Sequence, residues 1–460
     1  MFKFPKDFVW GTSTSAYQIE GAWLDGGKGL SIWDVFSHTP GKTLNGDNAD
    51  VACDHYNRLE EDVQLLKNLG VTAYRFSIAW TRIQPTGYGE RNKEGVEFYS
   101  KLIDLLLENN IDPWVTLYHW DLPATLDMEK DGWLNPNSAD YFAEYARICF
   151  EEFGDRVTKW TTFNEPWVTT ILGYGFGNFA PGRTSNTEPY IVAHNLLRSH
   201  GKAAKIYHEE FQSTQKGIIG VCNNCDWREP KTNSEADKEA AERALEFYLG
   251  WFADPLYKGE YPKSMRENVG DRLPKFTEED SAMIKGSCDF FGLNHYTTML
   301  TENDDRENIK NDADGFGGMD EDEKIILSSD ESWGKKTTMG WNIVPWGLTK
   351  LLKWIDERYD NPEIYITENG AGFDDKFIDG KINDVERIKF LDSYIKATTV
   401  AIDSGVNVKG YFVWSLLDNF EWASGYSQRF GMHHVDFKTL KRTPKESAKW
   451  YRDLIKKNEI

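Results

Sequence analysis

The chain has 460 residues, of which 40% are apolar and 14% aromatic, so it is long enough to bury a large core. Its formal net charge of −21 at pH 7 argues against nucleic acid and anionic membranes as partners, because both would repel it. No stretch approaches the roughly 18 consecutive apolar residues of a membrane-spanning helix.

The five cysteines are an odd number and sparse for this length, which argues against a disulfide framework. Cys222 and Cys225 form a C-x-x-C pair, but no second pair follows at zinc spacing, so we interpret them as packed core residues. We therefore predict no metal and no cofactor. The first residues lack the apolar run of a signal peptide, and together these features predict a cytoplasmic protein.

Eight short runs of β-forming residues recur along the chain, most of them followed by a longer segment with helical spacing. The predicted strands are Phe8–Trp10, Ala73–Ile78, Pro113–Tyr118, Val157–Phe163, Gly217–Val221, Phe290–Leu293, Ile364–Thr367 and Gly410–Trp414. Helical patterns cover residues 59–69, 95–109, 139–152, 236–251 and 385–404. Eight strand–helix units without a linker predict an α/β fold, a single (β/α)₈ TIM barrel with extended βα loops that forms one domain over residues 1–460.

One segment interrupts this rhythm. Residues 301–336 are acidic, contain glycine and show little periodicity, which predicts a long loop after the sixth strand. In a barrel this loop would hang over the active-site face, as a lid, a rim or solvated surface.

Polar and aromatic residues gather at the ends of the predicted strands. They are Gln18, Arg75, His119, Trp120, Asn164, Glu165, Trp167, Asn294, Tyr296, Glu368, Trp414, Glu421 and Trp422. Each alone has a structural explanation, but loops at the carboxyl ends of barrel strands build the active-site face. Sugar hydroxyls need donors and acceptors, and the apolar faces of a pyranose need flat aromatic surface. The pattern therefore favours a sugar-binding cleft.

Two carboxylates in this set have the placement that glycoside hydrolysis requires. Glu165 ends the fourth predicted strand and Glu368 the seventh. The reaction needs one acid to protonate the leaving oxygen and a second carboxylate on the other side of the anomeric carbon. If Arg75 and Tyr296 converge on Glu368, they should lower its pKa. Burial and the charge of Glu368 should raise the pKa of Glu165.

The segments Thr161–Pro166 (TTFNEP) and Ile366–Gly370 (ITENG) resemble the two signatures of glycoside hydrolase family 1, the β-glucosidase family. The similarity continues almost end to end, through residues 8–21, 118–123 and 414–422. This resemblance implies a retaining mechanism with Glu368 as nucleophile and Glu165 as acid/base. It also implies supporting roles for Arg75, Asn294 and Tyr296, substrate-binding roles for Gln18, His119, Trp120, Asn164, Trp414, Glu421, Trp422 and Phe430, and an aglycone side at Trp167 and Trp341.

The implied function is an exo-acting β-glycosidase that releases the non-reducing terminal glucosyl residue from β-glucosides and short β-linked oligosaccharides. A 6-phospho-β-glucosidase is the first alternative. Glu421 disfavours it, and residues 427–430 lack the lysine and tyrosine of a phosphate-binding segment. A catalytically silent sugar-binding protein is the second, and the intact acid pair speaks against it. The sequence leaves assembly as a homo-oligomer open.

Overall fold

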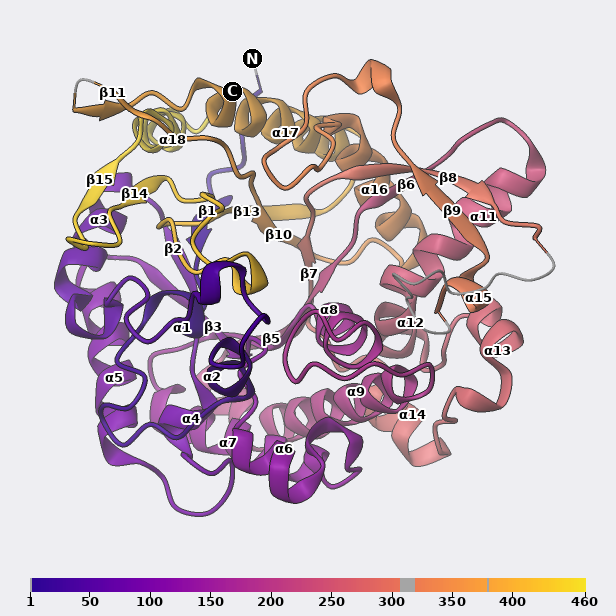
Figure 1. Ribbon diagram of the computed structural model, residues 1–460, viewed down its shortest axis with the longest axis horizontal. Coiled ribbons are helices and arrows are strands. Elements are labelled where there is room, and N and C mark those ends of the chain that lie inside the picture. The colour runs from indigo at the N-terminus through magenta and orange to yellow at the C-terminus, as the bar shows by residue number, and fades with distance from the viewer. Residues whose placement is uncertain (1, 307–318, 379) are drawn as a thin grey trace.

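The computed structural model describes residues 2–306, 319–378 and 380–460. Eight parallel strands close into a barrel in the order β1-β13-β10-β7-β5-β4-β3-β2, and helices surround it (Figure 1). The predicted TIM-barrel fold class is therefore confirmed. Among the described residues no helix is long and apolar enough to cross a membrane.

The barrel strands and their helices have the following bounds. The strands are β1 Val9–Ser13, β2 Ala73–Ser77, β3 Asp112–Tyr118, β4 Lys159–Asn164, β5 Ile218–Asn224, β7 Phe290–Asn294, β10 Ile364–Asn369 and β13 Val408–Trp414. The longer helices are α3 Leu59–Leu69, α5 Lys93–Glu108, α7 Ser138–Phe153, α9 Glu188–Ile206, α11 Glu235–Leu245, α12 Trp251–Lys258, α16 Pro345–Arg358, α17 Val385–Asp403 and α18 Glu446–Lys457. The shorter ones are α1 Ala16–Ile19, α2 Ile32–Ser37, α4 Trp80–Ile83, α6 Ala124–Lys130, α8 Pro166–Thr170, α10 Gln212–Gln215, α13 Lys263–Val269, α14 Glu278–Ile284 and α15 Met319–Glu323.

Each of the eight predicted strands overlaps one barrel strand, and the helix predicted over 59–69 coincides with α3. That helix ends at Gly70, which adopts the left-handed conformation (φ +76°) favoured by glycine at a helix end. The single helix predicted over 236–251 is wrong in detail. A π-helical turn over residues 246–250 separates α11 from α12.

The loop predicted over residues 301–336 contains regular structure that the sequence reading missed. A separate sheet has the order β6-β8-β9, formed by Trp227–Pro230, Thr298–Asn303 and Ile325–Ser328. The β-forming run Ile325–Leu327 was obscured by the acidic residues around it. Residues 307–318 of the predicted loop lie outside the described residues.

The remaining strands form two small antiparallel sheets of two strands each. These are β11 Phe377–Ile378 with β12 Lys381–Ile382, and β14 His433–Val435 with β15 Arg442–Pro444. The two termini lie side by side (Figure 1) and are joined by hydrogen bonds between Phe2 and Ile460, at 2.8 and 3.0 Å.

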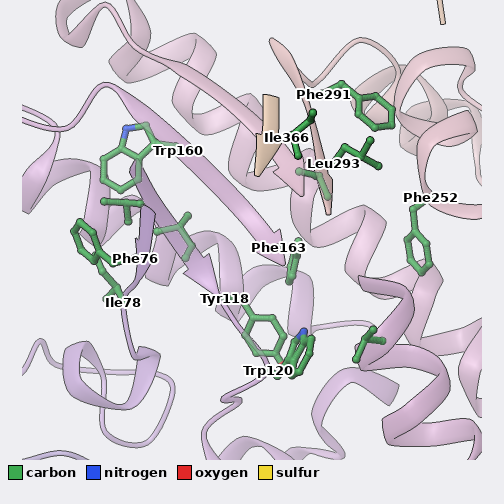
Figure 2. Packing of buried hydrophobic residues seen from close by; sticks show 14 of the residues in the cluster. Phe76, Ile78, Tyr118, Trp120, Trp160, Phe163, Phe252, Phe291, Leu293 and Ile366 are labelled. Atoms are coloured by element: carbon green, nitrogen blue, oxygen red, sulfur yellow. The ribbon is translucent and has the colours of Figure 1, made fainter. Parts of the chain in front are cut away.

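The core has two parts, one inside the barrel and one between the barrel and its helices. The inner cluster consists of Ala73, Trp114, Phe290, Tyr365 and Phe412. Figure 2 shows part of the outer cluster, in which side chains of β2, β4, β7 and β10 lie among the surrounding helices. Side chains two apart on a strand share a face, so Ala73 in the inner cluster places Arg75 on the barrel interior, nearer the carboxyl end. The aromatic cluster thus fills the interior below the site.

Candidate active site

A cavity of about 250 Å³ lies at the carboxyl ends of the barrel strands. Twelve of the predicted site residues line it: His119, Trp120, Glu165, Trp167, Asn294, Tyr296, Trp341, Glu368, Trp414, Glu421, Trp422 and Phe430. The other three predicted residues, Gln18, Arg75 and Asn164, are fully buried and bond to side chains at the cavity wall. None of the described residues in 301–336 lines the cavity.

Glu368 stands at the end of β10 and is held by two strong donors. Arg75 Nη1 donates to Glu368 Oε1 at 2.6 Å, and the Tyr296 hydroxyl donates to Oε2 at 2.6 Å. The predicted convergence of Arg75 and Tyr296 on this carboxyl is therefore found in the structure. Both oxygens of Glu368 are fixed, which orients the carboxyl group in the cavity.

Glu165 has a different environment at the end of β4. Its Oε1 accepts one hydrogen bond, from the neutral amide Asn294 Nδ2 at 2.7 Å. Its backbone N–H donates to the Cys222 carbonyl of β5 at 2.8 Å, and its φ of +46° lies in the left-handed region. This conformation is unfavourable for a residue with a side chain, at about 1–2 kcal/mol. It turns the chain sharply from β4 into α8, which begins at Pro166.

Two asparagines connect the two acids through a continuous chain of hydrogen bonds. Asn164 Oδ1 accepts from Arg75 Nη2 at 2.6 Å and from Asn294 Nδ2 at 3.0 Å. Asn294 Oδ1 accepts from Thr367 Oγ1 at 2.7 Å. Hydrogen bonds thus run from Glu165 through Asn294 and Asn164 to Arg75, which also bonds to Glu368, so the two acids are held relative to each other.

Burial raises the pKa of both acids. The pKa of Glu165 is raised well above its ordinary value by burial and then by the negative charge of Glu368. Burial also raises the pKa of Glu368, although Arg75 and Tyr296 act in the opposite direction. The expectation that Glu368 would have a lowered pKa is wrong, because desolvation of a buried carboxylate outweighs its two donors. Of the two acids, however, only Glu368 bonds to the Arg75 guanidinium, so a proton shared by the pair resides on Glu165.

Aromatic rings form part of the cavity wall. The rings of Trp120 and Trp422 lie 4.4 Å apart between centroids. His119 lies nearly parallel to Trp422 at 5.9 Å and to Trp414 at 6.0 Å. Trp120 and Trp422 also adopt left-handed backbone conformations, with φ of +77° and +51°. The cavity therefore offers the aromatic surface expected for a pyranose, on neighbouring rings.

Polar groups border this aromatic wall. Burial and then the charge of Glu368 raise the pKa of Glu421 to about 8, so an uncharged carboxyl predominates at neutral pH in the free protein. Gln18 Nε2 donates to Asn419 Oδ1 at 3.0 Å and to the Phe420 carbonyl at 2.9 Å, and it reaches Glu421 Oε2 only at 3.5 Å. Gln18 thus fixes the backbone next to Glu421.

His119 is a hydrogen-bonding group on the same side. Its Nε2 lies 3.0 Å from Asn164 Nδ2, and that amide nitrogen can only donate, so Nε2 is the acceptor. Burial, with Arg75 nearby, holds the pKa of His119 well below its ordinary value. The ring is therefore neutral, with its proton on Nδ1, an atom that has no hydrogen-bond partner among the described residues. Nδ1 is free to donate.

The structure also adds residues that the sequence reasoning missed. The cavity is also lined by Val168, Leu172, Phe179, Asn224, Asp226, Tyr248 and Met339. Asn224 ends β5, so the strand-end rule applied to the other strands could have found it. Phe179 and Tyr248 come from long connections and carry no such signal. Cys222 and Cys225 are buried free thiols, and no group of three or more His, Cys, Asp or Glu in the described chain could hold a metal ion.

The sequence and the structure were both compared with known proteins. The family model described as glycosyl hydrolase family 1 matches residues 1–460. The chain belongs to this family. "Beta-glucosidase 42" of Arabidopsis thaliana is 47% identical over 466 residues, covering 99% of this chain and 94% of the relative. The "1,4-beta-D-glucan glucohydrolase" of Thermotoga neapolitana is 46% identical over 462 residues and covers 100% of both chains.

The fold of this family 1 glycoside hydrolase also has solved counterparts. A mutant of the rice β-glucosidase Os3BGlu6, solved in a covalent complex with Glc, superimposes with a TM-score of 0.94. It is 46% identical in sequence, and the match covers 98% of each chain.

Proposed function

We propose that the enzyme is a retaining exo-β-glucosidase that acts on β-glucosides and short β-linked gluco-oligosaccharides such as cellobiose. The observation that carries the proposal is the unequal pair of acids in one cavity. Glu368 is bonded to a guanidinium and a phenol, whereas Glu165 is bonded to a neutral amide. The covalent Glc complex of the rice relative supports a mechanism with a glycosyl-enzyme intermediate.

The first step needs Glu368 ionised and Glu165 protonated. A carboxylate oxygen of Glu368 forms a bond to the anomeric carbon while Glu165 gives its proton to the glycosidic oxygen, and the bond from the anomeric carbon to that oxygen breaks. The aglycone departs as an alcohol, and glucose remains esterified to Glu368. Arg75 and Tyr296 keep the attacking carboxylate oriented and charged.

The second step releases the sugar. Glu165, now ionised, takes a proton from a water molecule, whose oxygen attacks the anomeric carbon and displaces Glu368. Two displacements restore the β configuration. Glu165 is protonated again and Glu368 leaves as a carboxylate, so both acids have their starting charge states for another turnover.

The site argues against the two alternatives. A 6-phosphate would need cationic partners, but Arg429 Nη1 is already bonded to Asp418 Oδ2 at 2.7 Å and to the Val435 carbonyl at 3.1 Å. Gln428 Oε1 accepts from Thr338 Oγ1 at 2.6 Å. A silent sugar-binding protein would not need two buried acids that share one cavity, since burying them is costly.

The stereochemistry of the released sugar tests this proposal. Proton NMR during hydrolysis of an aryl β-glucoside should show β-glucose first, with the α anomer appearing only by mutarotation. Initial release of α-glucose would overturn the retaining assignment. Faster turnover of the 6-phosphorylated substrate would instead favour the phospho-glucosidase.

A further inference from the structure

At the base of the loop that follows β13 lies a largely buried network of three cations and three carboxylates. It consists of Lys445, Arg387, Arg429, Asp375, Asp384 and Asp418. Lys445 and Asp418 have no exposed surface. None of the six residues lines the substrate cavity, and their formal charges balance. The network is therefore separate from the catalytic groups.

Asp418 joins the two ends of the β13 loop. Its Oδ2 accepts from Arg429 Nη1 at 2.7 Å, and its Oδ1 accepts from the Gly431 backbone N–H at 2.9 Å. Oδ1 also accepts from Lys445 Nζ at 2.7 Å. Asp418 stands where the chain leaves the barrel, and Arg429 and Gly431 stand where it returns. One carboxylate thus closes the base of the loop.

The closed loop carries sugar-facing groups. Glu421 and Trp422 lie between Asp418 and Arg429, and both line the cavity. Within the loop, the Glu421 N–H donates to the Gly425 carbonyl at 2.7 Å. The placement of Glu421 relative to the acids therefore depends on how the loop base is held.

The rest of the network anchors this base to the nucleophile side of the site. Lys445 bonds to Asp375, which follows β10 and its Glu368 in the chain. Arg387 Nη2 lies 2.9 Å from Asp375 Oδ2 and donates to the Arg429 carbonyl at 2.7 Å. The loops after β10 and β13 are consequently held in one arrangement by shared charged groups.

We propose that Asp418 and Arg429 are positioning residues for sugar recognition, which hold Glu421 and Trp422 in register with the two acids. The proposal rests on the proposed role of Glu421 in binding the sugar. If the network only stabilised the fold, a mutation in it would lower the melting temperature, and its effect on kcat/KM would be the same with or without Glu421. If the network positions Glu421, a change in the network should lower kcat/KM more when Glu421 is present than when it has been replaced.

A double-mutant cycle separates these two roles. Arg429→Met is the first variant, because the Arg429 side chain is 25% exposed and Asp418 keeps Lys445 as a partner after its removal. The value of kcat/KM for an aryl β-glucoside is measured for the wild type, Arg429→Met, Glu421→Ala and the double variant. We expect Arg429→Met to lower kcat/KM about 10-fold in the wild type, since small misplacements near reacting groups are costly. In the Glu421→Ala background the loss should shrink to about 2-fold or less, because Trp422 is then the only sugar-facing group that the network still holds in place.

Asp418→Asn is a second variant, and we expect it to lower kcat/KM more than Arg429→Met does. Arg429→Lys keeps a positive charge, so we expect its kcat/KM to lie between those of Arg429→Met and the wild type. Asp254→Asn is the matched control. Asp254 is buried and paired through both oxygens with Arg358, at 2.9 and 2.7 Å, and this pair joins α12 to α16. We expect the control to lower the melting temperature and to have the same effect on kcat/KM with or without Glu421.

Three results would overturn the proposal. Equal losses for Arg429→Met in both backgrounds would show that the network acts independently of Glu421. Unchanged kcat/KM in Arg429→Met and Asp418→Asn would show that it only supports the fold. An unchanged kcat/KM in Glu421→Ala alone would remove Glu421 from sugar binding, which refutes its proposed role and the positioning role together.

Discussion

The ends of β4 and β10 place the same residue type, glutamate, in the same cavity with opposite surroundings. Glu165 is 6% exposed and Glu368 is 3% exposed, so burial does not distinguish them. Their partners do. Glu368 accepts from a charged guanidinium and a phenol, and Glu165 accepts from an amide.

This difference shows how two identical side chains acquire different roles. Desolvation raises the pKa of both, so a low-dielectric site alone would leave the location of the proton undecided. Arg75 Nη1, 2.6 Å from Glu368, stabilises the negative charge there. The proton then belongs to Glu165, which becomes the acid. Changes that remove an acid or a partner should break this division of roles.

Removing Glu368 should have the largest effect. Glu368→Gly leaves no atom to attack the anomeric carbon, so we expect kcat for an aryl β-glucoside to fall by more than about 10⁴-fold. Azide or formate can occupy the vacated space and should restore part of the turnover. Steady-state kinetics with and without the anion measure both effects. Turnover near the wild-type rate without an anion would exclude Glu368 as the nucleophile.

Removing Glu165 should give a loss that depends on the substrate. General acid assistance contributes about 10²–10⁴-fold, and substrates with good leaving groups need little of it. We expect Glu165→Ala to reduce kcat/KM by that factor for alkyl glucosides and far less for dinitrophenyl glucoside. A series of leaving groups measures the dependence. Equal losses across the series would contradict the acid role.

The sequence predicted the barrel because each strand is a short β-forming run that ends in polar residues. It left the convergence of Arg75 and Tyr296 on Glu368 as a condition, which the barrel topology favours because strand ends meet at one face of a barrel. Those arguments depend on local pattern and on topology alone.

The pKa values and the contacts made by long connections could not be predicted from local pattern and topology. The net direction of the Glu368 pKa depends on desolvation, which requires the packing around the carboxyl. Phe179 and Tyr248 reach the cavity from connections whose paths follow no periodicity, and β9 was hidden among acidic residues. The partners of the Asp418 carboxylate are up to 27 residues away in the chain, so nothing local indicates that network.

Removing the Tyr296 hydroxyl should make the two acids more alike. Tyr296→Phe leaves Arg75 as the strong donor on Glu368. A hydrogen bond to a charged group contributes about 1.5–3 kcal/mol, so we expect kcat/KM to fall about 10–100-fold. Tyr248→Phe is the matched control, because the Tyr248 hydroxyl accepts a hydrogen bond from Asn224 Nδ2 at 3.1 Å and is bonded to no acid in the described part of the chain. A comparable loss in the control would show that the effect is not specific to Glu368.

The smallest expected effect concerns the pH dependence of stability at Glu421. Its pKa is about 8 in the folded protein, raised mainly by burial, against about 4.3 for an unperturbed glutamate. The folded state therefore binds the proton more tightly than the unfolded state.

It follows that the contribution of Glu421 to stability is complete below about pH 4.3 and is lost as pH rises to about 8. Glu421→Gln carries no charge at any pH and should not show this loss. We expect its melting temperature, relative to wild type, to increase by about 1–3 °C between pH 5 and pH 9. Differential scanning calorimetry across this range measures the difference. A constant difference would mean that Glu421 is ionised in the folded protein throughout, and its charge would then be available to repel a 6-phosphate at every pH.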